Sequence, residues 1–165
     1  MAFNYDGKTA AQYADRWWNS ANPQFLAFEN DCSNFISQCL FAGGMPMKNT
    51  GRMDAGWWYQ NKRYSYSWTT AHSLRWYLES LVGNGVEKVA NASDLQIGDV
   101  ISYDFEPDGV WNHSTIVTGF DKHGQPLVNA HTYAAQARPW RYDTSPAFTD
   151  QTQYIFWHIA GSSEK

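Results

Sequence analysis

One run of residues, from Asp31 to Gly44, constrains both the fold and the chemistry of this chain most strongly. Its apolar residues recur at a spacing that aligns them along one side of a helix, and paired glycines supply a C-terminal stop. These residues are Phe35, Ile36, Cys39, Leu40, Gly43 and Gly44. The run therefore predicts a helix from about Cys32 to about Ala42. Asp31 is expected to be its N-cap, with the carboxylate accepting from backbone N–H groups of the first turn.

Cys32 is the first residue of this predicted helix. Unpaired N–H groups and the positive end of the helix dipole favour a thiolate there, which is the nucleophilic form of cysteine. The alternative is a buried, inert cysteine, the commoner use of the residue. Cys39 lies on the apolar side of the same helix. At about 1.5 Å per residue the two Cα atoms are ~10 Å apart, beyond the ~7 Å limit for a disulfide, so both are expected to be free thiols.

Length and charge limit the class of protein. The 165 residues are predicted to form one domain, residues 1–165, because a chain near this length buries about 70% of its unfolded surface. The net charge of -4 and the pI near 5.6 argue against nucleic acid as a partner. Apolar runs fall short of the roughly 18 residues of a membrane span, and the first residues lack a signal-peptide core. We expect no membrane insertion, and either release by lysis or a place within a longer exported protein.

Aromatic residues are unusually frequent, with 9 Trp, 10 Tyr and 9 Phe. Few tryptophans are fully buried in proteins, so part of this aromatic surface should lie in a cleft. The segment 45–67 is a long loop rich in Gly, Asn and aromatic residues, and such loops are usually functional. We therefore expect Trp57, Trp58 and Trp68 to form a binding wall on which sugar rings stack. A packed structural flap is the alternative.

Helical patterns fill the first half of the chain and strand patterns the second half. The predicted helices are one capped by Asp6 or Thr9 and broken at Asn22-Pro23, one over 32–42 and one over 69–82. The predicted strands are 99–105, 113–119, 126–132 and 154–159. This order predicts an α+β fold in which N-terminal helices pack on an antiparallel β-sheet built around a three-strand meander.

A cysteine nucleophile needs a general base and a third group that orients the base. His113 begins a predicted strand, where its side chain can meet a helix N-terminus. Asn129 and His131 lie two residues apart on the next strand and so share a face, which makes Asn129 the candidate orienting residue and His131 the alternative. The remaining histidines, expected to be structural or solvated, are His72, His123 and His158.

The developing oxyanion needs two donors. The backbone N–H of Cys32 is the first. The second is open among Asn30, Gln24 and a tyrosine of the aromatic loop.

Together these segments resemble the bacterial putative amidase domain family, which looks like a branch of the papain-like cell-wall hydrolases related to the NlpC/P60 group. The matching segments are Asp31 to Leu40, Ala42 to Gly44, Pro46-Met47, Ser67 to Thr69, Gly98 to Ile101, Asn112 to Ser114 and Val128 to Thr132. The resemblance implies a papain-like, NlpC/P60-like fold. It also implies Cys32 as nucleophile, His113 as base and Asn129 as third polar residue, although related groups often have histidine at that third place.

The resemblance further implies a cysteine amidohydrolase or peptidase that cleaves an amide bond of peptidoglycan or a muropeptide. Asp31, His131 and the three tryptophans of the aromatic loop would then contact the substrate. We expect a monomer, acting outside the cell or in the cell wall, that needs no cofactor and no metal. A non-catalytic wall-binding module that retains the fold is the alternative from another functional class.

Two metal sites were weighed against this interpretation. The segment 104–109 mimics the start of an acidic calcium loop, but Thr115 stands at the position where a bidentate Glu is needed. A zinc site formed by Cys32, His113 and His131 lacks a close ligand pair of the usual spacing. Neither metal is expected.

Overall fold

The computed structural model describes residues 3–132 and 134–161. The helices are α1 (Gly7–Trp17), α2 (Cys32–Gly43), α3 (Tyr66–Thr69), α4 (Ala71–Ser80) and the short 3-10 helix η1 (Ala92–Asp94). The strands of the first half are β1 (Lys48–Asn49), β2 (Gly56–Trp57), β3 (Tyr59–Gln60) and β4 (Arg63–Tyr64). The later strands are β5 (Val86–Val89), β6 (Val100–Asp104), β7 (His113–Phe120), β8 (Pro126–Ala130), β9 (Ala135–Pro139) and β10 (Gln153–Ile159).

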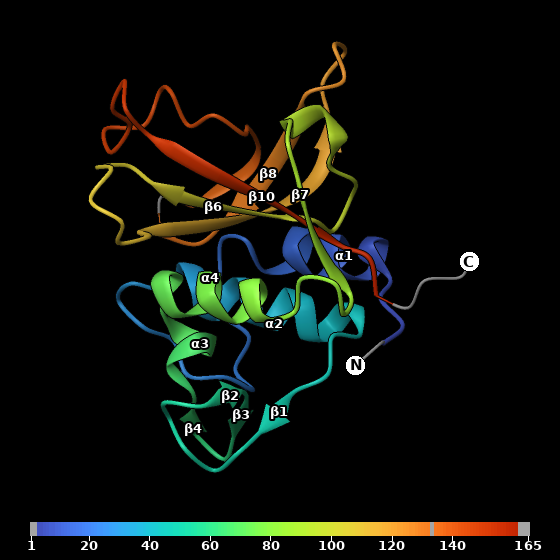
Figure 1. Cartoon of the computed structure of the whole chain (residues 1–165), viewed down its shortest axis with the longest axis vertical. Coiled ribbons are helices and arrows are strands. Elements are labelled where there is room, and N and C mark those ends of the chain that lie inside the picture. Colours follow the sequence, from blue (N-terminus) through green and yellow to red (C-terminus); the bar gives the residue numbers. More distant parts are fainter. Residues whose placement is uncertain (1–2, 133, 162–165) are drawn as a thin grey trace.

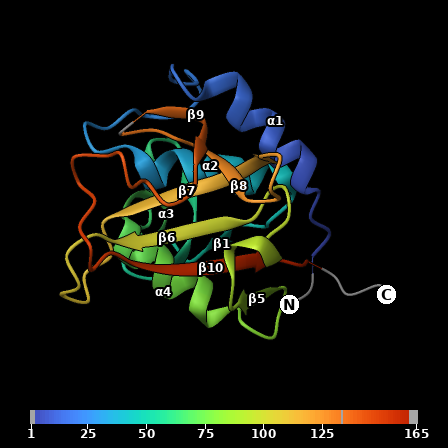
Figure 2. The ribbon, with the colours of Figure 1, turned by 90° about the horizontal axis from the view of Figure 1, so that it is seen from above.

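Strands β5 to β10 form one antiparallel sheet in the order β5-β10-β6-β7-β8-β9. The predicted meander is confirmed as β6, β7 and β8, and the predicted last strand as β10, whereas the edge strands β5 and β9 were not predicted. Helices α2 and α4 lie against one face of the sheet, and α1 runs beside β7 and β8 (Figures 1 and 2). The α+β architecture predicted from the sequence is therefore confirmed.

Helix α2 has the predicted bounds and is buried along nearly its whole length. It ends at Gly44, which adopts the left-handed conformation with φ 115°, and the N–H groups of Gly44 and Met45 return to carbonyls of the last turn. Gly43 lets α1 approach, because a Cβ there would lie 2.6 Å from the ring of Tyr5 and 2.9 Å from the Cβ of Ala10. The paired glycines thus both stop the helix and seat it.

The helix predicted over 69–82 is confirmed as α4, which is preceded by the short helix α3 that was not predicted. Thr70 lies between α3 and α4 in an extended conformation, with φ -118° and ψ 140°. Its hydroxyl accepts from the backbone N–H of Ser73 at 3.3 Å, so it caps α4.

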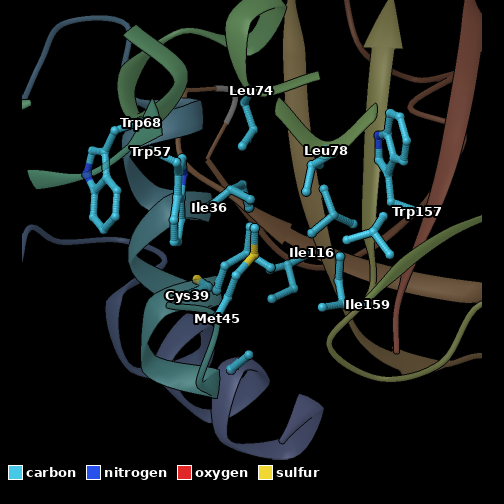
Figure 3. Packing of buried hydrophobic residues seen from close by; sticks show 14 of the residues in the cluster. Ile36, Cys39, Met45, Trp57, Trp68, Leu74, Leu78, Ile116, Trp157 and Ile159 are labelled. Carbon is cyan, nitrogen blue, oxygen red and sulfur yellow. The ribbon is translucent and has the colours of Figure 1, made fainter. Parts of the chain in front are cut away.

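Two hydrophobic clusters lie on the two faces of the sheet. The cluster between the sheet and the helices, shown in Figure 3, includes Ile36, Cys39, Met45, Trp57, Trp68, Leu74, Leu78, Ile116, Trp157 and Ile159. The cluster on the other face comprises Leu95, Ile101, Tyr103, Phe105, Val117, Val128 and Tyr142. Strand alternation places the neighbouring β7 residues Ile116 and Val117 in different clusters.

The predicted aromatic binding wall is wrong. Trp57, Trp58 and Trp68 are 0%, 2% and 0% exposed. The indole of Trp57 donates to Ser37 Oγ at 3.0 Å, and that of Trp68 donates to Asn34 Oδ1 at 3.0 Å. Because polar side chains of α2 satisfy these two indole N–H groups, the rings can be buried completely. The segment is therefore a structural flap, the alternative interpretation, held in place by the β1–β2 and β3–β4 pairs.

Candidate active site at the start of α2

Cys32 begins α2 and lines a cleft of about 750 Å³. The side chain is buried, and its sulfur lies 3.9 Å from Asn30 Oδ1, 3.8 Å from Ser33 Oγ and 3.9 Å from the backbone oxygen of Asn112. The junction of α3 with α4 and the segment before β7 supply further lining residues. Both Cys32 and Cys39 are free thiols, as predicted.

The environment of Cys32 favours the thiol over the thiolate. Burial raises the pKa of Cys32, and hydrogen bonds from the Ser33 hydroxyl and from the backbone N–H of Ser114 offset only part of this effect. The negative charge of Asp31 acts in the same direction as burial. The expectation of a thiolate stabilised by the helix dipole is therefore wrong for the resting site, because a dipole effect of about 0.3–1 kcal/mol is smaller than desolvation of a buried anion. A nucleophilic Cys32 would need a base.

The sulfur lies against the edge of β7 at the position of His113. The carbonyl of Asn112 and the N–H of Ser114 both contact it, and these two groups flank His113 along one edge of the strand. Strand β8 pairs with β7 from Ile116 onward, which leaves this edge to Cys32. The start of α2 and the start of β7 are thus brought together, as the sequence predicted. The roles of Cys32 as nucleophile and His113 as base stay predictions.

His113 is completely buried among aromatic rings. Its Nε2 lies 3.2 Å from the hydroxyl of Tyr142, and its ring centroid lies 5.5 Å from that of Tyr103 and 6.1 Å from that of Phe105. Burial lowers the pKa of His113 to about 3, and the positive charge of Arg138 contributes in the same direction. The imidazole is consequently neutral, but its low pKa makes it a weak proton acceptor in this state.

Tyr142 was not singled out from the sequence. It follows β9 and is itself 1% exposed, with the guanidinium of Arg138 4.0 Å above its ring. Burial raises the pKa of Tyr142, so its hydroxyl stays neutral beside His113. No local pattern marks Tyr142, since a turn with φ 60° and a contact across the sheet bring it to the site.

The structure does not bring Asn129 to His113. Asn129 pairs with Ile116, and strand alternation places positions 113 and 116 on opposite faces of the sheet. The amide of Asn129 donates to Asp15 Oδ1 at 2.9 Å and accepts from the hydroxyl of Thr118 at 2.9 Å. The predicted register is therefore corrected: Asn129 ties β8 to α1 and β7 and does not contact the predicted base.

Asp31 and His131 pair with each other, and both line a pocket of about 410 Å³ that is separate from the cleft of Cys32. Substrate contact by either residue stays a prediction. Asp31 Oδ2 lies 2.6 Å from His131 Nδ1, and the two side chains are 11% and 12% exposed. Asp31 Oδ1 accepts from the backbone N–H of Phe28 and from Asn34 Nδ2. His131 is thus directed at Asp31 and not at His113, so it is not the alternative orienting residue either.

Asp31 occupies the N-cap position, but its side chain makes no capping hydrogen bond. Its backbone, with φ -106° and ψ 6°, is outside the extended region typical of a side-chain cap. The carboxylate instead contacts His131. The predicted capping role of Asp31 is therefore wrong.

Two of the cleft residues outside the predicted set contact each other. Trp111 and His72 both line the cleft, and the backbone N–H of Trp111 donates to His72 Nδ1 at 3.2 Å. The guanidinium of Arg75 lies 5.7 Å from the Trp111 ring. Trp111 could have been suspected from its place two residues before His113, whereas the helical pattern around His72 indicated only a structural role.

Within the described ranges, no group of three His, Cys, Asp or Glu residues is placed to hold a metal ion. The three residues of the weighed zinc site have separate partners, as given above. Asp104, of the weighed calcium loop, accepts from the backbone N–H of Gly109 at 3.0 Å. No helix in the described part of the chain combines the length and apolar character needed to cross a membrane.

Comparison with known proteins identifies the family. Residues 4–157 match the family model described as "Putative amidase domain", and the chain belongs to this family. It is 48% identical to "Uncharacterized protein YhbB" of Bacillus subtilis (strain 168) over 165 residues, which are 99% of this chain and 53% of that protein. It is 30% identical to "Uncharacterized protein YjcM" of the same strain over 123 residues, 69% of this chain and 28% of that protein.

The chain thus spans about half the length of one curated relative and less of the other. No solved structure matches it. The description of the family indicates amide hydrolysis as the activity of its members.

Proposed function

We propose that this protein is a cysteine-dependent hydrolase of amide bonds in bacterial peptidoglycan or its muropeptides. One observation carries the proposal: Cys32 lines a cleft, and its sulfur lies at the edge of β7 next to the position of His113. The imidazole of His113 is neutral. Membership of the amidase family supports amide hydrolysis. A helix-borne cysteine beside a strand-borne histidine supports the papain-like, NlpC/P60-like assignment.

In this mechanism His113 takes the proton of the Cys32 thiol as the sulfur attacks the amide carbonyl. The imidazolium then donates the proton to the leaving amine, and water hydrolyses the resulting thioester. In this proposal the hydroxyl of Tyr142 orients the imidazole through Nε2. Catalytic hydrogen bonds are often long without substrate and tighten in the substrate complex, as proton transfer to His113 requires.

The oxyanion of the tetrahedral intermediate would be held by two donors. The first is the backbone N–H of Cys32, which lies in the first turn of α2, where no intrahelical acceptor exists. The second is the side-chain amide of Asn30, which lines the same cleft next to the sulfur. Gln24, another candidate from the sequence, lines a separate pocket between α1 and α2.

The lining of the cleft supports a substrate with both sugar and peptide parts. Trp111 offers an aromatic surface on which a sugar ring can stack, and Thr69, His72 and Glu106 offer polar groups to a peptide. With such a substrate, the proposal includes action outside the cell or in the cell wall, as a monomer.

The decisive experiment is digestion of purified peptidoglycan followed by mass spectrometry of the new termini. A free lactyl group on the sugar with a new peptide amine identifies an amidase, and a cut inside the stem peptide identifies an endopeptidase. Cys32→Ala should abolish the products, whereas the matched Cys39→Ala should retain them. Binding to peptidoglycan without any new terminus would overturn the proposal in favour of the wall-binding module.

A further inference from the structure

The side chain of His131, which follows β8 in the chain, contacts both the start of α2 and the end of α1. Its ring stacks on Phe35 in α2, with centroids 4.0 Å apart and an interplanar angle of 8°. Nδ1 lies 2.6 Å from Asp31 Oδ2, and Nε2 lies 2.5 Å from the backbone oxygen of Trp17, the last residue of α1. One imidazole therefore contacts both elements on which the position of Cys32 depends.

The hydrogen-bond inventory determines what this ring does. A carboxylate and a backbone carbonyl are acceptors, so in this arrangement both nitrogens of His131 donate. The other oxygen of Asp31 accepts from Phe28 N–H at 2.8 Å and Asn34 Nδ2 at 2.9 Å. The backbone N–H of Asp31 donates to Thr132 Oγ1 at 2.8 Å, next to His131. Asp31, the residue before Cys32, is thus held by hydrogen bonds to both carboxylate oxygens and from its backbone N–H.

We propose that Asp31 and His131 are a positioning pair that fixes the start of α2, and with it the sulfur of Cys32, against α1 and β8. The inference rests on the proposed function only in taking Cys32 as the nucleophile. The pair touches neither substrate nor the reacting atoms in this assignment. It acts by preventing the first turn of α2 from shifting away from the edge of β7, where a small misplacement would remove alignment with His113.

The chain contains a matched control in a second histidine–aspartate pair. His158 Nδ1 lies 2.9 Å from Asp99 Oδ2, and this pair joins β10 to the turn before β6. This pair also joins a histidine to an aspartate, but it does not contact α2. His158→Phe therefore measures what the loss of such a pair does to stability alone, and His131→Phe measures the same loss at the start of α2.

The experiment compares these variants in a Cys39→Ala background, so that one thiol reports. Hydrogen exchange of the first turn of α2 and the rate of Cys32 alkylation by iodoacetamide are measured with peptidoglycan turnover. His131→Phe, which retains a ring against Phe35, should accelerate exchange and alkylation while lowering turnover by about 10-fold or more, as for other supporting residues. His158→Phe should leave all three near the parent values.

Replacing Asp31 by Asn and by Ala separates the effect of its hydrogen bonds from the effect of its charge. Asp31→Asn can keep its oxygen on Phe28 and Asn34, so hydrogen exchange of the first turn and turnover should stay close to the parent. Alkylation is not compared for this variant, because loss of the Asp31 charge also removes one cause of the raised pKa of Cys32. Asp31→Ala should behave as His131→Phe and provides the test if the latter does not fold. Parent-like exchange and alkylation in both disruptive variants would overturn the proposal. Absence of turnover in the parent would instead reject the proposed function, and exchange and alkylation would still decide the positioning role.

Discussion

The hydroxyl of Tyr142 lies 3.2 Å from Nε2 of His113, although the two residues are 29 positions apart and Tyr142 lies outside the strands of the meander. Tyr142 thus makes the contact with His113 that the sequence predicted for Asn129. A neutral hydroxyl can orient an imidazole without adding a second titrating group near neutral pH. Tyr142 is therefore the residue that the structure offers as the orienting partner of the candidate base.

Tyr142→Phe tests this role with little change of volume. It should lower turnover by about 10-fold or more, part of the 10²–10⁴ that positioned acid–base groups contribute, with KM largely unchanged. The control is Tyr154→Phe, since Tyr154 donates to the backbone oxygen of Arg141 at 2.7 Å and does not contact His113. Equal turnover in both variants would exclude Tyr142 as the orienting group.

Asn30→Ala tests the second oxyanion donor. Removal of one such donor typically costs about 10²–10³ in kcat, and Asn30 is exposed, so the free energy of unfolding should change little. Gln24→Ala, in the pocket between α1 and α2, should retain parent kcat. Steady-state kinetics on a short amide substrate gives the answer, and a parent-like kcat for Asn30→Ala would remove it from the mechanism.

Two tryptophans should respond in opposite ways. Trp111→Ala should raise KM for polymeric peptidoglycan more than for a short peptide, because Trp111 lines the cleft, and should change stability little. Trp57→Phe should instead lower the free energy of unfolding by about 1–3 kcal/mol, since it leaves Ser37 without its indole donor in the core. Urea unfolding and kinetics on both substrates separate the two effects. Equal KM changes on the two substrates would contradict a sugar-stacking role for Trp111.

Local signals were sufficient to predict the elements that carry the site. The helix at Cys32 has an apolar stripe and a glycine stop close in sequence, and the strand at His113 has β-branched residues between two turns. Their approach was also expected. The protonation state of Cys32 was not predicted, because desolvation depends on how the whole chain packs around the sulfur. The effect of the helix dipole, by contrast, can be inferred from the position of Cys32 in the sequence.

Contacts that depend on register or on distant segments could not be predicted. Asn129 and His131 were placed opposite His113, but the pairing of Asn129 with Ile116 moves both to the face that meets α1 and α2. A shift of one residue in such a pairing exchanges the faces of the sheet. Tyr142 reaches His113 through a turn without a sequence pattern. Trp57 and Trp68 were misassigned because their burial depends on acceptors supplied by α2.

The His158–Asp99 pair should give stability a measurable pH dependence. The hydrogen bond to Asp99 raises the pKa of His158 above its ordinary value, and partial burial opposes this only in part. Since the folded state binds the proton more tightly, the contribution is fully present below the unfolded pKa of about 6.5 and is lost as pH rises through the folded pKa.

His158→Gln should accordingly be less stable than the parent at acidic pH, with a difference below about 1 kcal/mol because the pair is partly solvated, and the difference should shrink as the solution becomes alkaline. Only the difference is informative: the lowered pKa of His113 makes both proteins lose stability below about pH 6.5, since that group is protonated more readily when unfolded. Urea unfolding of both proteins from acidic to alkaline pH measures this difference in the free energy of unfolding. A difference that grows with pH would show that Asp99 does not stabilise the protonated ring.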